Sequence, residues 1–116
     1  MSVYTPATLI TAKAMGNGAA NIATWRYQNT GGAGTFGIVR TAIFMGSGGS
    51  AGTITVEQGS TAADTVAQKI LDAVQLVAAV PYILNGWYTV QNNDYWEGFA
   101  SNATTNGGAY GYTSTG

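Results

Sequence analysis

The segment PYILNGWYTVQ, residues 81–91, carries the clearest local structural signal in the chain. Asn85-Gly86 stands between two runs that are rich in β-branched and aromatic residues. This dipeptide is preferred at the centre of a two-residue type I′ turn, because both central residues of that turn need a positive φ. The segment therefore predicts a β-hairpin with its turn at Asn85-Gly86, in an antiparallel β protein.

The chain after this segment continues with turns and strands. QNND (91–94) and TTNGG (104–108) predict turns, whereas YWEGFASN (95–102) and AYGYTST (109–115) predict strands. Short strands separated by polar, glycine-containing turns are typical of antiparallel sheets.

The chain before the segment has two strand patterns of its own. FGIVRTAIFM (36–45) has apolar residues on both alternating faces, which predicts a strand buried on both sides. TITVEQ (53–58) alternates more cleanly and predicts a half-buried strand. GSGGSAG (46–52) between them predicts a loop, so residues 36–58 are expected to form an antiparallel pair.

Two further strands are predicted near the N-terminus. TLITAKAM (8–15) and ANIATWRYQN (20–29) both alternate, and the loop GNGA joins them. GGAG at 31–34 ends the second strand.

The segment 60–80 fits two structures. Val66, Ile70, Val74 and Val77, at spacings of 4, 4 and 3, fit an amphipathic helix, which local propensity favours. The alternative is a loop at 59–68 followed by a strand at 69–77.

These segments predict about seven or eight short strands in an all-β fold. The expected architecture is an antiparallel β-sandwich, either a jelly roll or immunoglobulin-like. A chain of 116 residues has the length of one domain. We expect residues 1–116 to form a single sandwich, with residues 1–7 as an extended N-terminal arm.

The composition is poor in charge. The chain has four basic and five acidic residues, and its charged fraction is 8%, where a typical soluble domain has about 25%. A net charge of −1 gives no field that would attract nucleic acid or an anionic membrane. No apolar run reaches the roughly 20 residues that span a bilayer. Because 46% of the residues are apolar, we expect much of the surface to lie against other chains.

The chain has no cysteine and no histidine. Disulfides, thiolate or imidazole metal sites, and Cys-His or Ser-His catalytic pairs are therefore excluded. The acidic residues lack the spacing of a calcium loop; they are Glu57, Asp64, Asp72, Asp94 and Glu97. We expect no bound metal.

Two motifs suggest catalysis or cofactor binding, and neither is supported by its context. GSGGSA (46–51) matches a dinucleotide fingerprint, but strand-forming residues follow it where the fingerprint needs a helix. Asp94 and Glu97 invite a glycosidase interpretation, but a spacing of three along a strand places the two carboxylates on opposite faces. We expect no catalytic residue, no cofactor and no enzymatic activity.

Aromatic residues are the remaining candidates for function. NGWYTVQNNDYWEGFA (85–100) combines five of them with asparagines, and alternation divides them between a core face and a face that covers a subunit boundary or binds a ligand. Trp and Tyr dominate interface hot spots. The candidate contact residues are Trp25, Tyr27, Trp87, Tyr88, Tyr95, Trp96, Tyr110 and Tyr112. The alternative is a sugar platform, with polar contacts from Asn92, Asn93 and Asp94.

The order of segments over residues 36–115 resembles the small all-β virion accessory proteins of tailed bacteriophages. The resemblance lies in a strand GIVRTAIFM, a Gly/Ser turn, a strand TITVEQG, a motif AADTVAQKILD, a strand AVQLVA and an LNGW hairpin. It implies an immunoglobulin-like or jelly-roll sandwich, and it favours the loop at 59–68 and the strand at 69–77 over the helix. The first 30 residues lie outside it.

The resemblance also implies a function. We expect a virion structural protein, synthesised in the host cytoplasm. Its implied role is that of a capsid decoration or cement protein that packs against the major capsid protein as a homo-oligomer, commonly a trimer. A neck, collar or tail protein is the nearest alternative. A carbohydrate-binding module for attachment to the host surface is the alternative of a different class.

Overall fold

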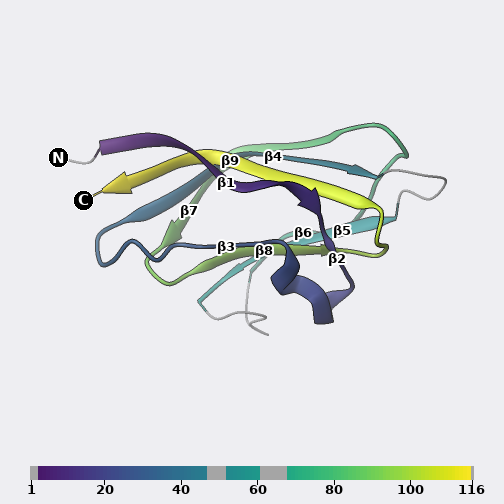
Figure 1. Cartoon of the computed structure of the whole chain (residues 1–116), viewed down its shortest axis with the longest axis horizontal. Helices are drawn as coiled ribbons and strands as arrows, with labels where there is room; N and C mark the ends of the chain where they lie inside the picture. Colours follow the sequence, from purple (N-terminus) through teal and green to yellow (C-terminus); the bar gives the residue numbers. More distant parts are fainter. Residues whose placement is uncertain (1–2, 47–51, 61–67, 116) are drawn as a thin grey trace.

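The computed structural model describes residues 3–46, 52–60 and 68–115, which form a sandwich of two β-sheets (Figure 1). The all-β class expected from the sequence is confirmed. The described residues contain nine strands, more than the seven or eight expected, and one 3₁₀ helix. The elements are β1 (Val3–Ala14), β2 (Gly16–Asn17), η1 (Ala19–Thr24), β3 (Arg26–Gln28), β4 (Phe36–Gly46), β5 (Thr53–Gly59), β6 (Gln68–Gln75), β7 (Tyr82–Gln91), β8 (Tyr95–Ala100) and β9 (Thr105–Thr115).

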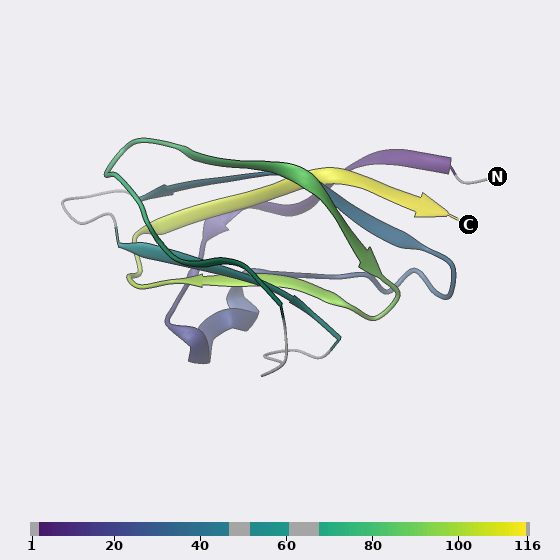
Figure 2. The ribbon, with the colours of Figure 1, turned by 180° about the vertical axis from the view of Figure 1, so that it is seen from behind.

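The strands divide into two layers. Sheet A has the order β1-β9-β4-β7 and is antiparallel throughout. Sheet B has the order β2-β8-β5-β6, and β3 pairs with β8 as well. Sheet A is the upper layer in Figure 1, and the view from behind in Figure 2 shows the same two layers. Residues 3–7 belong to β1 and pair with β9, so both ends of the chain lie at one end of the sandwich.

The predicted hairpin at Asn85-Gly86 is wrong. β7 runs through this dipeptide as one ten-residue strand, and neither residue has a positive φ. The β-rich runs on both sides of Asn85-Gly86 pair with the same strand, β4, instead of with each other. Pairing with β4 along the whole of β7 outweighs the local preference for a turn.

A β-bulge replaces the predicted turn. Val39 pairs with Tyr88 and Thr41 pairs with Asn85, so the two residues between Asn85 and Tyr88 lie opposite Arg40 alone. The bulge also changes the phase of β4: Val39 faces the core before it, and Ala42 faces the core after it. The strict alternation expected over residues 36–45 therefore fails at Arg40.

The predicted antiparallel pair over residues 36–58 is also wrong. Both strands form where they were expected, but β4 lies in sheet A and β5 lies in sheet B. Each is an inner strand with two neighbours: β4 lies between β9 and β7, and β5 lies between β8 and β6. No hydrogen-bonding edge remains for the two to pair. The dinucleotide-like motif between them falls at 46–51, of which only Gly46 is among the described residues.

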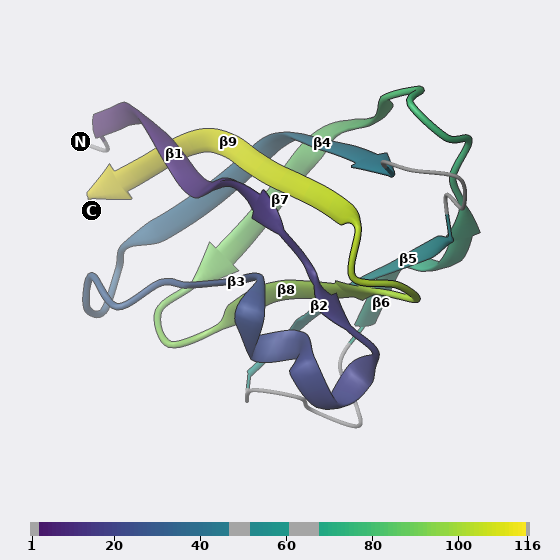
Figure 3. The same cartoon turned by 45° about the vertical axis from the view of Figure 1, so that its right-hand side comes forward.

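The predicted strand at 20–29 forms only at its C-terminal end. Ala19–Thr24 is the 3₁₀ helix η1, and Arg26–Gln28 is the short strand β3. The helix is needed because β2 pairs parallel with β8, whereas β3 pairs antiparallel with the same strand. The chain must reverse between β2 and β3, and η1 makes this reversal on the side of sheet B away from sheet A (Figure 3).

The strand alternative for residues 60–80 is confirmed. β6 pairs with β5 in sheet B, and no helix forms over the described residues of this segment. Most of the expected loop at 59–68 lies outside the described residues. Ile70 and Val74 have a spacing of four residues, as in a helix, although they lie on a strand. The pairing of β6 with β5 is irregular, and Ala73 has φ 48°, so the alternation of side chains between the two faces is interrupted between Ile70 and Val74.

The last predicted turn is displaced towards the N-terminus. β9 begins at Thr105, so most of the segment 104–108 belongs to the strand. Gly107 is required there by packing, since a Cβ atom on it would lie 2.9 Å from Cδ1 of Phe44. The glycine that suggested a turn instead gives room for the core.

The core lies between the sheets and is built around three rings. Trp25, Phe44 and Trp96 have no solvent exposure. The centroid of the Trp25 ring lies 5.4 Å from that of Phe44 and 5.7 Å from that of Trp96. Trp25 also donates a hydrogen bond of 2.8 Å from Nε1 to the carbonyl oxygen of Gly107, which connects the chain beside sheet B to sheet A.

Candidate interaction surface

The outer face of sheet A, which points away from sheet B, carries several exposed apolar side chains. Five large hydrophobic side chains from its strands are more than one-third exposed on it; they are Tyr4, Ile43, Met45, Ile83 and Trp87. Alternate residues of the same strands, such as Phe44 and Val90, belong to the core. The apolar side chains on this face are therefore surplus to the core.

One end of this face carries three mutually contacting rings, Tyr4, Trp87 and Tyr112, which we call the aromatic cluster. The Tyr4 and Trp87 centroids are 6.2 Å apart at 74°, and each lies within 6.4 Å of the Tyr112 centroid. Tyr4 is 54% exposed and Trp87 is 53% exposed. Ile38 beneath them is only 3% exposed although it is not part of the core cluster, so the aromatic cluster has a packed floor.

Arg40, the residue at the bulge, holds Trp87 from the side. Its guanidinium carbon lies 5.2 Å from the centroid of the Trp87 ring, and Nη1 donates a hydrogen bond to the carbonyl oxygen of Gly86. The bulge places both Gly86 and Trp87 opposite Arg40. The cation–π contact therefore depends on the β-bulge that replaces the predicted turn.

The other end of the face is aliphatic. Ile43 pairs directly with Ile83 across β4 and β7, and Met45 follows two residues along β4. We call Ile43, Met45 and Ile83 the aliphatic cluster. A shallow hollow of about 160 Å³ borders it, lined by Ala12, Ile43, Met45, Asn106, Gly107 and Tyr110.

Charge is divided unequally between the sheets. The four strands of sheet A contain two charged residues, Lys13 and Arg40, and no acidic residue. The strands of sheet B contain five, which are Arg26, Glu57, Lys69, Asp72 and Glu97. The few charged residues of the chain therefore lie mostly in sheet B, and the strands of sheet A carry almost none.

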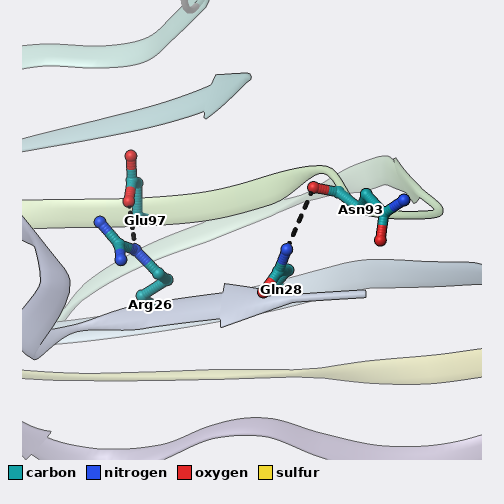
Figure 4. A network of polar contacts seen from close by, with 4 residues as sticks. All are labelled: Arg26, Gln28, Asn93 and Glu97. Atoms are coloured by element: carbon teal, nitrogen blue, oxygen red, sulfur yellow. Dashed lines mark hydrogen bonds and ion pairs between the residues drawn. The ribbon is translucent and has the colours of Figure 1, made fainter. Parts of the chain in front are cut away.

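The charged residues of sheet B are involved in strand pairing. Arg26 and Glu97 are direct partners on β3 and β8, with Nε 2.5 Å from Oε1, and Glu97 is 2% exposed (Figure 4). Arg26 also lies over the ring of Tyr95, 4.9 Å from its centroid. Gln28 adds a hydrogen bond of 3.4 Å to the carbonyl oxygen of Asn93 (Figure 4). These contacts fasten the short strand β3 to the sheet.

Charges extend in one row across sheet B. Glu57 on β5 pairs with Glu97 on one side and with Lys69 on the other. The order across the sheet is therefore Arg26, Glu97, Glu57 and Lys69, with a cation at each end. Like charges directly opposite on neighbouring strands are destabilising. Arg26 offsets the charge of Glu97, whereas Lys69 forms an ion pair with Asp72, with Nζ 3.4 Å from Oδ1.

The eight aromatic residues proposed as contact residues lie in three different places. Trp25 and Trp96 are completely buried in the core, and Tyr27 and Tyr88 pack against the core from its margin. Tyr95 lies under Arg26 on the outer side of sheet B. The remaining three lie on the outer face of sheet A; they are Trp87, Tyr110 and Tyr112. Within this last group, the rings of Trp87 and Tyr112 contact each other, with centroids 6.3 Å apart.

Sequence reasoning missed several residues of this face. Tyr4 was assigned to an N-terminal arm, but it pairs with Ser114 within sheet A and completes the aromatic cluster. Ile43 and Met45 were assigned to a strand buried on both sides, yet both are more than one-third exposed. Their alternation with Phe44 was visible in the sequence; which face lay outward was not.

The remaining candidate groups take part in packing or turns. Asp94 lies in the turn between β7 and β8, where its main-chain oxygen accepts a hydrogen bond from the N–H of Asn29. Glu97 is buried beside Arg26. Burial raises the pKa of the Tyr27 phenol above its ordinary value, and its hydroxyl lies over Gly37, where a Cβ atom would lie too close to it.

Within residues 3–46, 52–60 and 68–115, no three acidic side chains gather closely enough to hold a metal ion. The same residues include no helix of the length and apolar character needed to cross a membrane.

Comparison with protein-family models, with curated proteins and with solved structures finds no match to this chain in any of the three.

Proposed function

We propose that the sandwich is a jelly roll. If β2 and β3, which share one edge of β8, count as one strand, eight strands remain. The first then pairs with the last, the second with the seventh, the third with the sixth and the fourth with the fifth. This nested pairing is what results when one long hairpin is wound into two sheets, as in the double Greek key of a jelly roll.

The pairing supports a jelly roll over an immunoglobulin-like sandwich. Immunoglobulin sheets have the orders ABED and CFG, so their first two strands are neighbours within one sheet. Here β1 pairs with β9, the last strand of the chain, whereas β2 and β3 lie in the other sheet. Among the described residues, β5 and β6 are the only consecutive strands that pair with each other.

We infer that the chain is a non-enzymatic virion structural protein of a tailed bacteriophage, and that it acts as a capsid decoration or cement protein. The observation that carries this proposal is the outer face of sheet A, with its exposed aliphatic cluster and no acidic residue in its strands. Large exposed apolar surfaces mark interaction sites. The resemblance of residues 36–115 to phage accessory proteins supplies the assignment to a virion.

The proposed mechanism is burial of apolar surface. Sister subunits, most simply three, and the major capsid protein cover the aliphatic cluster of Ile43, Met45 and Ile83. Each square ångström removed from water contributes roughly 25 cal/mol, and a standard interface buries about 800 Å² on each partner. Many copies on one particle act together, so individually weak contacts stabilise the coat lattice. A position at the neck, collar or tail would use the same surface with a different partner.

The test combines light scattering with capsid binding. We expect the purified protein to form a trimer and to saturate capsids stripped of accessory proteins at a fixed ratio to the coat protein. The double variant Ile43→Thr/Ile83→Thr keeps β-branched residues in the strands but removes two of the three members of the aliphatic cluster, and it should be monomeric and fail to bind.

Gln68→Thr, at an exposed position of β6 in the other sheet, is the matched control and should behave as the wild type. A stable monomer that ignores capsids would contradict the proposal. Undiminished binding by the double variant would contradict the assigned surface.

A further inference from the structure

The aromatic cluster borders a cleft that the proposed assembly surface does not need. The cleft has a volume of about 230 Å³ and opens on the outer face of sheet A. It is lined by Tyr4, Phe36, Ile38, Trp87, Thr89 and Ser114. These residues come from all four strands of the sheet, so the cleft is formed by the fold and not by a loop.

Contacts within the chain already restrict the side chains that line the cleft. Tyr4 and Trp87 meet nearly edge to face, Tyr112 contacts both, and Arg40 lies against the indole. Little side-chain entropy is lost when such rings bind a ligand, because their positions are already restricted. The aliphatic cluster has no comparable bracing by aromatic rings.

The cleft is amphipathic, which distinguishes it from the aliphatic cluster. Trp87, Phe36 and Ile38 supply apolar surface, whereas the lining residues Tyr4, Thr89 and Ser114 supply hydroxyl groups. Tyr4 is 54% exposed and Thr89 is half-buried, so their hydroxyls can donate and accept towards a ligand. Ser114 is only 2% exposed and adds to the lining of the cleft.

A pyranose ring matches this combination. It presents a flat face of C–H groups, which the negative face of an aromatic ring attracts, and a rim of hydroxyl groups that need hydrogen-bond partners. A nucleic-acid base would also stack on Trp87, but strand binding requires a cationic groove, and the sheet offers only Arg40 and Lys13. The edge-to-face contact between the indole and the phenol leaves both rings half exposed at the border of the cleft.

We propose that the cleft lined by Tyr4 and Trp87 binds one sugar ring of a glycan. The site goes beyond the assembly role, because it uses the other end of sheet A. Ile38, on the floor of the cleft, and Ile43, in the aliphatic cluster, are five residues apart on β4, which corresponds to roughly 17 Å along a strand. A subunit held by its aliphatic cluster can therefore keep the cleft open.

Tryptophan fluorescence offers a selective test, because Trp25 and Trp96 are completely buried and Trp87 is half exposed. The probes are the methyl glycosides of glucose, galactose, mannose and N-acetylglucosamine, each titrated to about 50 mM. We expect at least one to change the emission saturably, with a Kd of about 1 mM, an ordinary value for a small ligand with few contacts.

Variants assign the binding to the cleft. Trp87→Ala should abolish the binding and Tyr4→Ala should weaken it about tenfold, both measured by sugar-observed NMR because Trp87→Ala removes the fluorophore. Tyr95→Ala, an aromatic truncation on the outer side of sheet B, is the control and should bind as the wild type. The absence of saturable binding for all four sugars would overturn the proposal, as would equal binding by Trp87→Ala and the wild type.

The double variant Ile43→Thr/Ile83→Thr separates this proposal from the assembly proposal. It should lose association with capsids and retain sugar binding. Retained association in the wild type without sugar binding refutes only the cleft, whereas sugar binding without association refutes only the assembly role.

Discussion

The outward side chains of the two sheets differ in what they contact. On sheet B, outward residues are used within the fold: Arg26, which is 22% exposed, forms an ion pair with the buried Glu97, and η1 lies against that side of the sheet. On sheet A, the outward residues Ile43, Ile83 and Trp87 remain exposed and contribute little to burial within the chain. The difference teaches that the outward side chains of one sheet can stabilise the fold while those of the other contribute little to it and are available for the binding that we propose.

A substitution in the core between the two sheets should cause the largest loss in the free energy of unfolding. Trp25→Ala removes a completely buried indole and its hydrogen bond to Gly107, so we expect a loss of about 4 kcal/mol in the free energy of unfolding. Urea denaturation measures this loss. Trp87→Ala, the same substitution at an exposed ring, should lose under about 1 kcal/mol.

If Trp25→Ala fails to fold, Trp25→Phe provides a milder comparison, since it keeps a ring and removes only the donor and part of the volume. Equal losses for Trp25→Ala and Trp87→Ala would contradict the assignment of the two indoles to core and surface.

Removing the cation beside Glu97 should have the next largest effect. Arg26→Ala leaves a carboxylate that is 2% exposed without its guanidinium, and breaking a buried pair in this way costs about 3 kcal/mol. A double-mutant cycle with Glu97→Gln, followed by urea denaturation, tests the cause. The double variant should recover part of the stability, because it no longer buries a charge; a double variant as unstable as the sum of the single ones would show that the two side chains do not act together.

The exposed cation of sheet A should matter much less. Arg40→Ala removes the cation–π contact with Trp87, which is worth about 0.5 to 1 kcal/mol at an exposed site. Thermal unfolding measures the stability, and acrylamide quenching reports on the exposure of Trp87, which should increase. If Arg40→Ala lost as much stability as Arg26→Ala, the proposed difference between the outer faces of the two sheets would be wrong.

The smallest effect on stability is expected at the aliphatic cluster. Ile43→Thr/Ile83→Thr should change the free energy of unfolding by no more than about 0.5 kcal/mol, since both side chains are exposed in the single chain. Light scattering on the same samples should show the loss of association. A large loss of stability with unchanged association would mean that these residues act within the fold.

The sequence allowed prediction of most strands but of few pairings. Residues 36–45 and 53–58 form strands because β-branched residues favour an extended chain locally. Their placement in different sheets depends on β7, β8 and β9, which lie far along the chain. Asn85-Gly86 shows the limit most clearly, because its turn preference is real and is overruled by pairing of β7 with β4 over its full length.

The candidate surface was predictable in kind but not in position. The low charge led us to expect a surface that lies against other chains, which stays a prediction; alternation indicated that the aromatic residues would divide between the core and the surface. The sequence could not separate Trp87 from Trp96, since the direction in which a strand faces depends on where the second sheet lies. The contact of Arg40 with Trp87 could not be predicted from the sequence either, because it depends on the β-bulge.

The pairing of Val3 with Thr115 makes the two ends of the described chain leave the sandwich side by side. A peptide or reporter domain attached through either end would emerge at the same point, next to Tyr4 and Ser114. Either fusion would sterically cover the aromatic cluster and leave the aliphatic cluster, at the far end of β4, accessible. For anyone who uses this sandwich as a display scaffold, the choice between the two ends changes almost nothing, and the length of the linker determines whether the cleft stays accessible.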